Sequence, residues 1–288
     1  MNASLPDDIE AVVAAALRED LGAGDLTAAL IPAAERRRAT VITRESAVLC
    51  GAAWFEACFR QIDPAVRIRW RHQDADAVTA GATLCDLEGP ARALLTAERT
   101  ALNFLQTLSG TATATRVYAD VVAGTRCRIL DTRKTLPGLR LAQKYAVRCG
   151  GGTNHRLGLY DGVLIKENHI AAAGSIEAAV HAARASNRGV LVEIEVESLQ
   201  EFDAALTTDV DRIMLDEFTL ADMRAAVGRA AQRRGGRVEL EASGNVTLES
   251  LRAVAATGVD FVSIGAITKH VRAVDLSMRL ETADRSRQ

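Results

Sequence analysis

The sequence lacks any apolar stretch that approaches the length of a membrane span. Its first residues, Met1 to Asp8, carry early acids and show neither the charged region nor the apolar region of a secretion signal. Neither sign of charge is in large excess, because 35 Lys and Arg oppose 37 Asp and Glu. A nucleic-acid-binding protein usually has a dominant basic face. We therefore predict a cytoplasmic protein with no membrane partner and no nucleic-acid partner.

Metal-binding and redox motifs are missing as well. The five cysteines are odd in number, and no two of them have the Cys-x-x-Cys spacing of a zinc ribbon or a redox motif. We expect reduced thiols at Cys50, Cys58, Cys85, Cys127 and Cys149. Four histidines show no ligand pairing at helical or strand spacing, and we expect structural or surface positions for His72, His169, His181 and His270.

From about Arg128 onward, short apolar runs recur, and each is followed by a helix-like segment. The runs are residues 128–131, 162–166, 190–195, 212–216, 238–243 and 261–265. Strands that alternate with helices imply parallel pairing and right-handed crossovers. The pattern predicts an α/β barrel of TIM type, with a short extra strand near Thr153. A doubly wound open sheet is the alternative, but no Gly-x-Gly-x-x-Gly turn follows an early strand.

The first hundred residues follow a different pattern. A helix over 5–17 and strands over 40–42, 47–50 and 66–70 predict a smaller α+β domain with antiparallel strands. A helical pattern over 91–108, interrupted at Ser109 and Gly110, leads into the barrel. The alternating segment 273–280 is expected to return to the first domain as a strand. The predicted domains are residues 1–110 joined by 271–288, and residues 111–270.

Positive charge is concentrated between Arg126 and His169, where cations outnumber acids and glycine and apolar residues lie between them. This composition predicts a pocket for a polyanionic small molecule, and a solvated basic face is the alternative. Arginine binds carboxylates at two points, and lysine acts as a point charge on phosphate. We place in the pocket Arg133, Lys134, His155, Arg156 and Lys166. For three further cations, which recur at helical spacing, the solvent side of a helix is the alternative to the pocket: Arg140, Lys144 and Arg148.

Two acids end consecutive predicted strands, Glu195 and Asp216. Carboxylates on neighbouring strands suit magnesium, which takes a few protein oxygens beside phosphate and water. Glu193 and Glu197 flank Glu195 at two-residue spacing, so strand alternation leaves open which acid points inward. A purely structural salt bridge is the alternative. After the last two strands, the turns Ser243-Gly244-Asn245 and Ser263-Ile264-Gly265-Ala266 would let backbone N–H groups approach a phosphate.

Several longer motifs closely resemble those of the quinolinate phosphoribosyltransferase family. They are Ala97–Asn103, Asp131–Gly138, Lys144–Val147, Gly150–Arg156, Ile165–His169 and Glu241–Gly244, together with Gly22–Thr27 near the start. The match spans essentially the whole chain. The resemblance implies an N-terminal α/β sandwich domain and an incomplete barrel. It also implies a dimer or larger assembly in which one subunit's first domain covers the barrel mouth of the partner.

The resemblance also implies roles for individual residues. Arg99 matches the arginine that reaches quinolinate across the interface, and Thr132 belongs to the substrate-binding set. The substrate carboxylates would be bound by Arg133, His155, Arg156 and Lys166. Lys134, Glu195 and Asp216 would bind phosphoribosyl pyrophosphate, with the two acids as magnesium ligands. The implied catalytic residues are Lys134, Lys166, Glu195 and Asp216, and the two late turns match phosphate-holding turns. Thr268-Lys269-His270 departs from the Thr-His-Ser often found in the family.

The implied reaction joins quinolinate to phosphoribosyl pyrophosphate and releases pyrophosphate and carbon dioxide, giving nicotinate mononucleotide for de novo NAD biosynthesis. The nearest alternative is a phosphoribosyltransferase for nicotinate or another aromatic acid, including relatives from molybdenum gene clusters, but a monocarboxylate needs fewer cations. A second alternative is a barrel aldolase that uses Lys166 as a Schiff base. A third is a non-catalytic anion-binding barrel.

Overall fold

The helices and strands divide into two units. The computed structural model describes residues 4–186, 189–233 and 236–281. The first unit holds the described parts of Met1–Arg116, Thr135–Gly151 and Thr268–Gln288. The second unit holds those of Val117–Lys134 and Gly152–Ile267. No described helix combines the length and the apolar composition that a membrane span requires.

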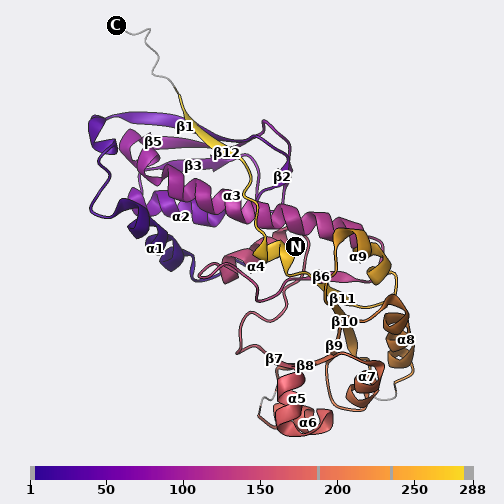
Figure 1. The fold of residues 1–288 in the computed structure, drawn as a ribbon. Coiled ribbons are helices and arrows are strands. Elements are labelled where there is room, and N and C mark those ends of the chain that lie inside the picture. The colour runs from indigo at the N-terminus through magenta and orange to yellow at the C-terminus, as the bar shows by residue number, and fades with distance from the viewer. Residues whose placement is uncertain (1–3, 187–188, 234–235, 282–288) are drawn as a thin grey trace. The chain divides into compact units, whose positions relative to one another are not determined.

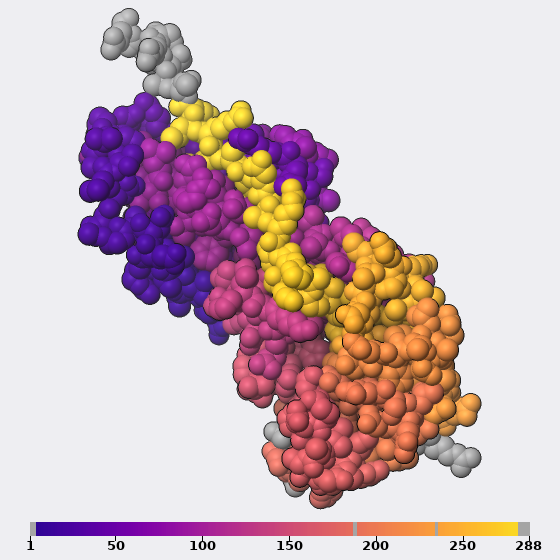
Figure 2. All heavy atoms as spheres, viewed as in Figure 1, coloured from indigo at the N-terminus to yellow at the C-terminus, as the bar shows by residue number. Residues whose placement is uncertain are grey.

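A four-stranded antiparallel sheet forms the centre of the first unit, in the order β12-β1-β5-β3 (Figure 1). Its strands are β1 (Arg36–Thr43), β3 (Arg67–Trp70), β5 (Thr83–Pro90) and β12 (Leu276–Leu280). A separate antiparallel pair joins β2 (Ala47–Val48) to β4 (Ala77–Val78). The prediction that the last segment returns to this unit as a strand is confirmed, because β12 pairs with β1. Figure 2 shows β12, in yellow, on the surface of the unit.

Helices supply the other half of this core. They are α1 (Ile9–Leu21), the short 3-10 helix η1 (Ala28–Leu30), α2 (Ala52–Ile62), α3 (Ala91–Val122) and α4 (Arg140–Cys149). Burial in the last residues of β1 alternates, so that Val41 is inside and its neighbours are half-buried. Val41, Leu84 of β5, Phe55 of α2 and Leu105 of α3 belong to one apolar cluster. The sheet therefore buries one face against these helices.

Helix α4 belongs to the first unit, whereas the predicted boundaries place its residues in the barrel domain. Tyr145 and Ala146 join the apolar cluster of this unit. Gly150 directly follows α4, and a Cβ on it would lie 2.4 Å from the Ala112 carbonyl oxygen of α3. The alternative that places Lys144 on the solvent side is wrong, since this residue is 1% exposed. The same alternative holds for Arg148, which is exposed.

Helix α3 runs without a break from Ala91 to Val122, so the predicted interruption at Ser109 and Gly110 is wrong. The Ser109 hydroxyl accepts the Cys50 N–H at 3.0 Å and donates to the Cys50 carbonyl at 3.1 Å. A Cβ on Gly110 would lie 2.2 Å from the Arg272 carbonyl oxygen. Both residues therefore serve contacts with distant segments and do not end the helix.

The second unit is built on a parallel sheet in the order β6-β11-β10-β9-β8-β7. Its strands are β6 (Arg128–Leu130), β7 (Gly162–Ile165), β8 (Leu191–Val196), β9 (Arg212–Asp216), β10 (Glu239–Ser243) and β11 (Phe261–Ser263). All six predicted strands are present. The expected extra strand is a single bridge between Thr153 and Leu130. Because β6 and β7 are the two ends of the order, the described strands form an open barrel rather than a closed one.

Helices follow the strands of this sheet in turn. They are α5 (Glu167–Ala173), α6 (Ile176–Ser186), α7 (Leu199–Leu206), α8 (Leu220–Ala231), α9 (Leu248–Ala255) and the short α10 (Ala266–Lys269) at the boundary of the units. Figure 1 shows α6, α7, α8 and α9 along the outer side of the sheet. Side chains Ser198, Thr219 and Thr247 accept backbone N–H groups at the starts of α7, α8 and α9. These caps begin the helices directly after the strand ends.

We expect Gly110→Ala to lower the free energy of unfolding by about 1–3 kcal/mol, because the added methyl group meets the Arg272 carbonyl. The matched control is Gly228→Ala in α8, where no atom lies within 4 Å of the added Cβ. That change should be neutral or stabilising by up to about 1 kcal/mol. Urea unfolding of both variants measures the difference. Equal effects of the two substitutions would contradict the close approach at Gly110.

Candidate active site

The carboxyl ends of the six parallel strands lie along one edge of the second unit's sheet. Most predicted site residues are at this edge: Thr132, Arg133, Lys134, Lys166, Glu195, Asp216, Ser243, Gly244, Asn245, Ser263, Gly265 and Ala266. Arg99 is elsewhere, since it belongs to α3 in the first unit. It is exposed and lines a groove of about 680 Å³ beside α1.

Lys166 and Glu195 form an ion pair across the neighbouring strands β7 and β8. The register pairs Ile165 with Ile194, so the next residues on each strand are level. Lys166 Nζ lies 2.5 Å from Glu195 Oε2. The lysine side chain is 43% exposed and that of Glu195 is 11% exposed, so the ammonium group faces the open edge while the carboxylate is largely sheltered. A cation held in this way can meet an anionic ligand without leaving its partner.

Lys134 extends over Gly265 at the end of β11. A Cβ on Gly265 would lie 3.1 Å from Lys134 Cδ and 3.6 Å from Thr132 Oγ1. The Lys134 N–H donates to Thr132 Oγ1 at 3.0 Å, which tightens the turn after β6. Because Gly265 has no side chain, the Lys134 side chain has room to lie along the strand ends.

The turn after β10 is held by the turn after β9. Gly244 has φ +91°, and a Cβ on it would lie 2.6 Å from Glu217 Cγ. Asn245 Nδ2 donates to Glu217 Oε1 at 3.0 Å, and the Glu217 N–H donates to the Ser243 carbonyl at 3.0 Å. Glu217 and Asn245 have positive φ themselves, at 54° and 45°. The two turns are therefore a single interlocked structure beside Asp216.

Asp131 fixes the segment that carries His155 and Arg156. Its carboxylate is buried and accepts the His155 N–H at 2.9 Å and the Asn154 side-chain amide at 2.6 Å. The Arg156 N–H donates to His155 Nδ1 at 2.7 Å, so the imidazole carries its proton on Nε2 when neutral. The Arg156 N–H thus holds the imidazole ring at Nδ1, and Asp131 holds the backbone of the same residue.

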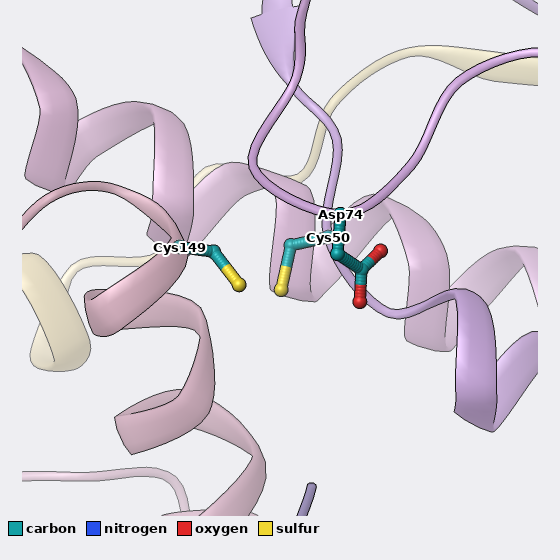
Figure 3. A group of neighbouring side chains, drawn as sticks. All are labelled: Cys50, Asp74 and Cys149. Atoms are coloured by element: carbon teal, nitrogen blue, oxygen red, sulfur yellow. The ribbon is translucent and has the colours of Figure 1, made fainter. Parts of the chain in front are cut away.

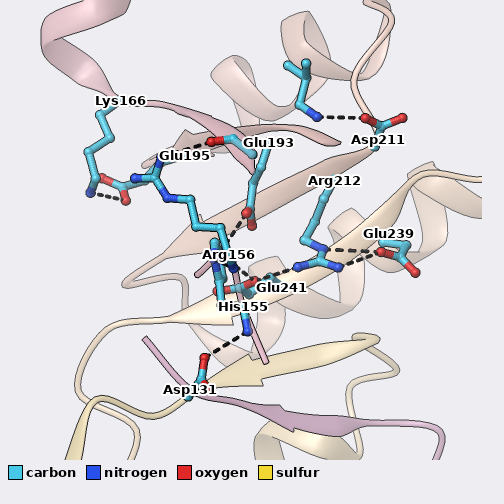
Figure 4. Close-up of polar contacts among 12 residues, drawn as sticks. Asp131, His155, Arg156, Lys166, Glu193, Glu195, Asp211, Arg212, Glu239 and Glu241 are labelled. Carbon is cyan, nitrogen blue, oxygen red and sulfur yellow. Dashed lines mark hydrogen bonds and ion pairs between the residues drawn. The ribbon is translucent and has the colours of Figure 1, made fainter. Parts of the chain in front are cut away.

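The imidazole of His155 points into the interior of the sheet, toward two buried carboxylates (Figure 4). His155 Nε2 lies 2.8 Å from Glu193 Oε2 and 3.7 Å from Glu241 Oε2. Arg212 faces the same acids, with Nη1 at 3.4 Å from Glu241 Oε2, and its guanidinium also stacks 4.2 Å from the Phe261 ring centre. His155, Glu193 and Glu241 are close enough together to hold a metal ion, but Arg212 already supplies positive charge there.

The pKa of Glu241 is raised to about 8, chiefly by burial and next by the charge of the neighbouring Glu193, against the opposing effects of His155 and Arg212. Burial also raises the pKa of Glu193. Two carboxylates this close in a dry interior favour sharing one proton. The structure also shows which acids of β8 and of the residues after it point inward, which strand alternation left open. Glu193 and Glu195 share the inner face and Glu197 is exposed after the strand.

Arg156 and Arg133 place two guanidinium groups within electrostatic range of each other. Burial lowers the pKa of Arg156, and the charge of Arg133 lowers it as well. Arg156 Nη1 donates to the Gly162 carbonyl at 3.2 Å, and Arg133 is exposed. Like charges held together in this way raise the affinity for an anion that lies between them.

Comparison with known proteins agrees with this geometry. The family model described as quinolinate phosphoribosyl transferase, C-terminal domain, matches residues 111–279, and the N-terminal domain model matches residues 25–109. Nicotinate-nucleotide pyrophosphorylase (carboxylating) of Mycobacterium leprae is 43% identical over 272 residues, which cover 92% of this chain and 94% of that protein. The chain belongs to the quinolinate phosphoribosyltransferase family.

Two further relatives cover nearly all of the chain. Quinolinate phosphoribosyltransferase (decarboxylating) 1b of Nicotiana tabacum is 39% identical over 292 residues, covering 96% of this chain and 83% of that protein. The solved structure of the nicotinate-nucleotide pyrophosphorylase from Francisella tularensis is 46% identical and superimposes with a TM-score of 0.92. That match covers 97% of this chain and 100% of the other. The predicted family and the predicted fold class are therefore confirmed.

Sequence reasoning missed the residues that support the site in this family member. The predicted site did not include Asp131, Arg212, Glu217 or Glu241, and Glu193 was left open as an alternative to Glu195. A signal for two of them was present, because Arg212 and Glu241 are charged residues inside apolar strand segments. Such residues are seldom buried unless they are paired. No comparable signal marked Glu217, whose role depends on a neighbouring turn.

We expect Glu241→Gln to stabilise the protein more at high pH than at low pH. The pKa of Glu241 is raised from its ordinary value of 4.5 to about 8, so the folded protein keeps this carboxyl protonated over a pH range in which the unfolded chain ionises it. The contribution of Glu241 to the free energy of unfolding is therefore fully present below pH 4.5 and is lost as the pH rises through about 8. The glutamine cannot ionise, so the variant should exceed the wild type by about 1 kcal/mol or more near pH 8 and by less near pH 5. Urea unfolding at both pH values measures this difference.

The matched control is Glu197→Gln, which makes the same chemical change at an exposed carboxylate directly after β8. If Glu241→Gln gives the same gain at both pH values, Glu241 does not hold a proton in the folded protein.

Proposed function

We propose that this protein is a quinolinate phosphoribosyltransferase that forms nicotinate mononucleotide, pyrophosphate and carbon dioxide from quinolinate and phosphoribosyl pyrophosphate in NAD biosynthesis. The observation that carries the proposal is the placement of Arg133, Lys134, Arg156 and Lys166 at the strand ends of a chain that belongs to this family. Two carboxylates and three phosphoryl groups enter one site in this reaction. Fixed cations at that edge match this charge.

Quinolinate would bind at the part of the edge formed after β6 and β7. Arg133 and Arg156 supply guanidinium groups for its carboxylates, and Lys166 supplies an ammonium group beside them. The ring of His155 faces Glu193, so we assign His155 to holding Arg156 in place through Nδ1. Arg99 would complete the quinolinate site from a second copy of the chain, because it is exposed in a groove of the first unit.

Phosphoribosyl pyrophosphate would bind across the ends of β8 to β11. Lys134 passes over Gly265 toward this region, and the turns at Ser243–Asn245 and Ser263–Ala266 would offer backbone N–H groups to phosphate. Glu195 and Asp216 lie at the ends of neighbouring strands, which fits the few carboxylates that magnesium takes beside phosphate and water. When bound, the metal would neutralise charge on the departing pyrophosphate.

The chemistry of the reaction follows from this arrangement. The pyridine nitrogen of quinolinate attacks the anomeric carbon of the ribose, and pyrophosphate leaves through a transition state with oxocarbenium character. Lys134 stabilises negative charge that develops on the leaving group. The ribosylated ring is then positively charged at nitrogen, and this charge stabilises the electron pair that stays on C2 when its carboxylate departs as carbon dioxide. A proton from water then adds to C2 and gives nicotinate mononucleotide. Arg133, Arg156 and Lys166 hold the ring in the orientation that both steps require.

A direct assay tests this function. The purified protein, incubated with quinolinate, phosphoribosyl pyrophosphate and magnesium, should release carbon dioxide and pyrophosphate and form nicotinate mononucleotide. Arg133→Ala should lower kcat/KM for quinolinate roughly 10- to 150-fold, because it removes a charge-assisted contact of about 1.5–3 kcal/mol. Arg224→Ala removes an exposed arginine from the outer helix α8 and is the control. Product from nicotinate with none from quinolinate would contradict the proposal.

Subunit mixing tests whether active sites are shared in a homodimer. Arg99→Ala and Lys134→Ala chains are each expected to be inactive. After mixing and exchange, random dimers should recover roughly a quarter of wild-type activity, because half of them contain one intact site of two. Mixing Lys134→Ala with Asp216→Ala is the control and should recover none, since both changes affect the same barrel. Confirmed exchange without recovery in the first mixture would rule out a shared site.

A further inference from the structure

Two cysteine thiols face each other inside the first unit (Figure 3). Cys50 precedes α2 and is 0% exposed, and Cys149 is the last residue of α4 and is 5% exposed. Their sulfur atoms and a carboxylate oxygen of Asp74 all lie within 4.8 Å of one another. Figure 3 shows the two Sγ atoms directed toward each other, with the carboxylate of Asp74 beside Cys50. The proposed active-site chemistry uses none of these residues.

Each thiol is held in place by the backbone around it. The Cys50 N–H and carbonyl both bond to the Ser109 hydroxyl of α3, at 3.0 and 3.1 Å. Cys149 is followed by Gly150, which lies against α3 so closely that a Cβ on it would be 2.5 Å from Thr115 Cβ. Helix α3 is thus a common support for both cysteines. Their mutual approach is built into the packing and does not depend on a mobile loop.

Hydrogen bonds from the protein explain why the Asp74 carboxylate lies beside the two thiols, and no metal ion is needed. Oδ1 accepts the Gly51 and Ala52 N–H groups at 3.1 and 3.2 Å, at the start of α2, and Oδ2 accepts the Tyr145 hydroxyl at 2.8 Å. Three hydrogen bonds on one carboxylate explain its burial as an anchor for α2 and α4. A zinc ion would have to compete with these bonds for the oxygen atoms. A disulfide between the two facing thiols, in contrast, would leave the hydrogen bonds of Asp74 in place.

We propose that Cys50 and Cys149 form a reversible redox-modification site, in which a peroxide converts the thiol pair into a disulfide that joins the last turn of α4 to the residue before the N-cap of α2. This inference does not depend on the proposed function. Peroxide is small enough to reach a nearly buried thiol, whereas a bulky disulfide reagent is not.

The two thiols are suited to different steps of this reaction. Hydrogen bonding from Cys50 lowers the pKa of Cys149, and the charge of Arg148 acts in the same direction. Burial raises the pKa of Cys50. The thiolate of Cys149 attacks one peroxide oxygen, the O–O bond breaks and hydroxide leaves, which gives a sulfenic acid. The Cys50 sulfur then attacks that sulfur, the S–OH bond breaks, and the two thiol protons end in two molecules of water.

The disulfide would bridge two points that are far apart in the sequence. Helix α4 lies in the chain between Arg133 and Lys134 on one side and His155 and Arg156 on the other. A covalent bond at Cys149 therefore restrains the segment that joins these two groups of cations. It also closes a long loop of the unfolded chain, which stabilises the folded state.

Peptide mapping of the full-length protein tests the site. After treatment with hydrogen peroxide, acid quenching, alkylation and trypsin, we expect residues 45–60 linked to residues 149–156, with a mass two hydrogen atoms below the sum of the peptides. Residues 45–60 also contain Cys58, so the linked peptide must be fragmented to identify the bonded cysteine. We expect the fragments to place the bond on Cys50. Thiol titration in denaturant should fall from five groups to three, and dithiothreitol should restore five. The oxidised protein should also melt at a higher temperature than the reduced protein.

Variants make the result specific. Cys50→Ala and Cys149→Ala should each abolish the linked peptide, whereas Cys127→Ala, which removes a buried thiol of the second unit, should retain it. Oxidation of Cys149 to the sulfinic acid with no linked peptide would overturn the proposal. Stoichiometric zinc in the purified protein that is lost in both Cys50→Ala and Cys149→Ala would also overturn it, because the pair would then be a metal centre.

Discussion

The candidate active site depends on charge compensation between buried side chains on the parallel sheet of the second unit. Glu193 and Glu241 are fully buried, and Arg212 and His155 face them. Removing one partner from such a buried group costs about 3–5 kcal/mol, because a charge is left without a counter-charge. His155 is also bonded to the N–H of Arg156. The charge balance among the buried side chains is thereby connected through His155 to Arg156.

The cations at the strand ends depend on glycines as much as on their own charges. Gly265 leaves room for the Lys134 side chain, and Gly244 lets the turn after β10 approach Glu217. A side chain at either position would displace the group beside it. The same principle operates in the first unit at Gly110, where α3 meets the carbonyl of Arg272. Lack of room for a Cβ is the common reason for these three glycines, and only the one at Gly244 also has a positive φ.

A large part of the second unit could be predicted from the sequence. A buried parallel strand is a short apolar run, and six such runs marked the six strands because this pattern is local. The residues that follow each run are local too, so the pattern alone was enough to assign cations and acids to one edge of the sheet. The family and the reaction class rest on long motifs, and the comparisons confirm them. The roles of single residues, magnesium and the homodimer stay predictions.

The sequence by itself determined where the strands lie and which chemical groups stand at their ends, because both follow from neighbouring residues. Only the tertiary structure decided that α3 continues through Gly110, that Lys144 is buried, and that Glu193 points inward beside Glu195. It also decided that Cys50 and Cys149 face each other. Each of these outcomes depends on contact between residues far apart in the chain, and local patterns carry no information about such contacts.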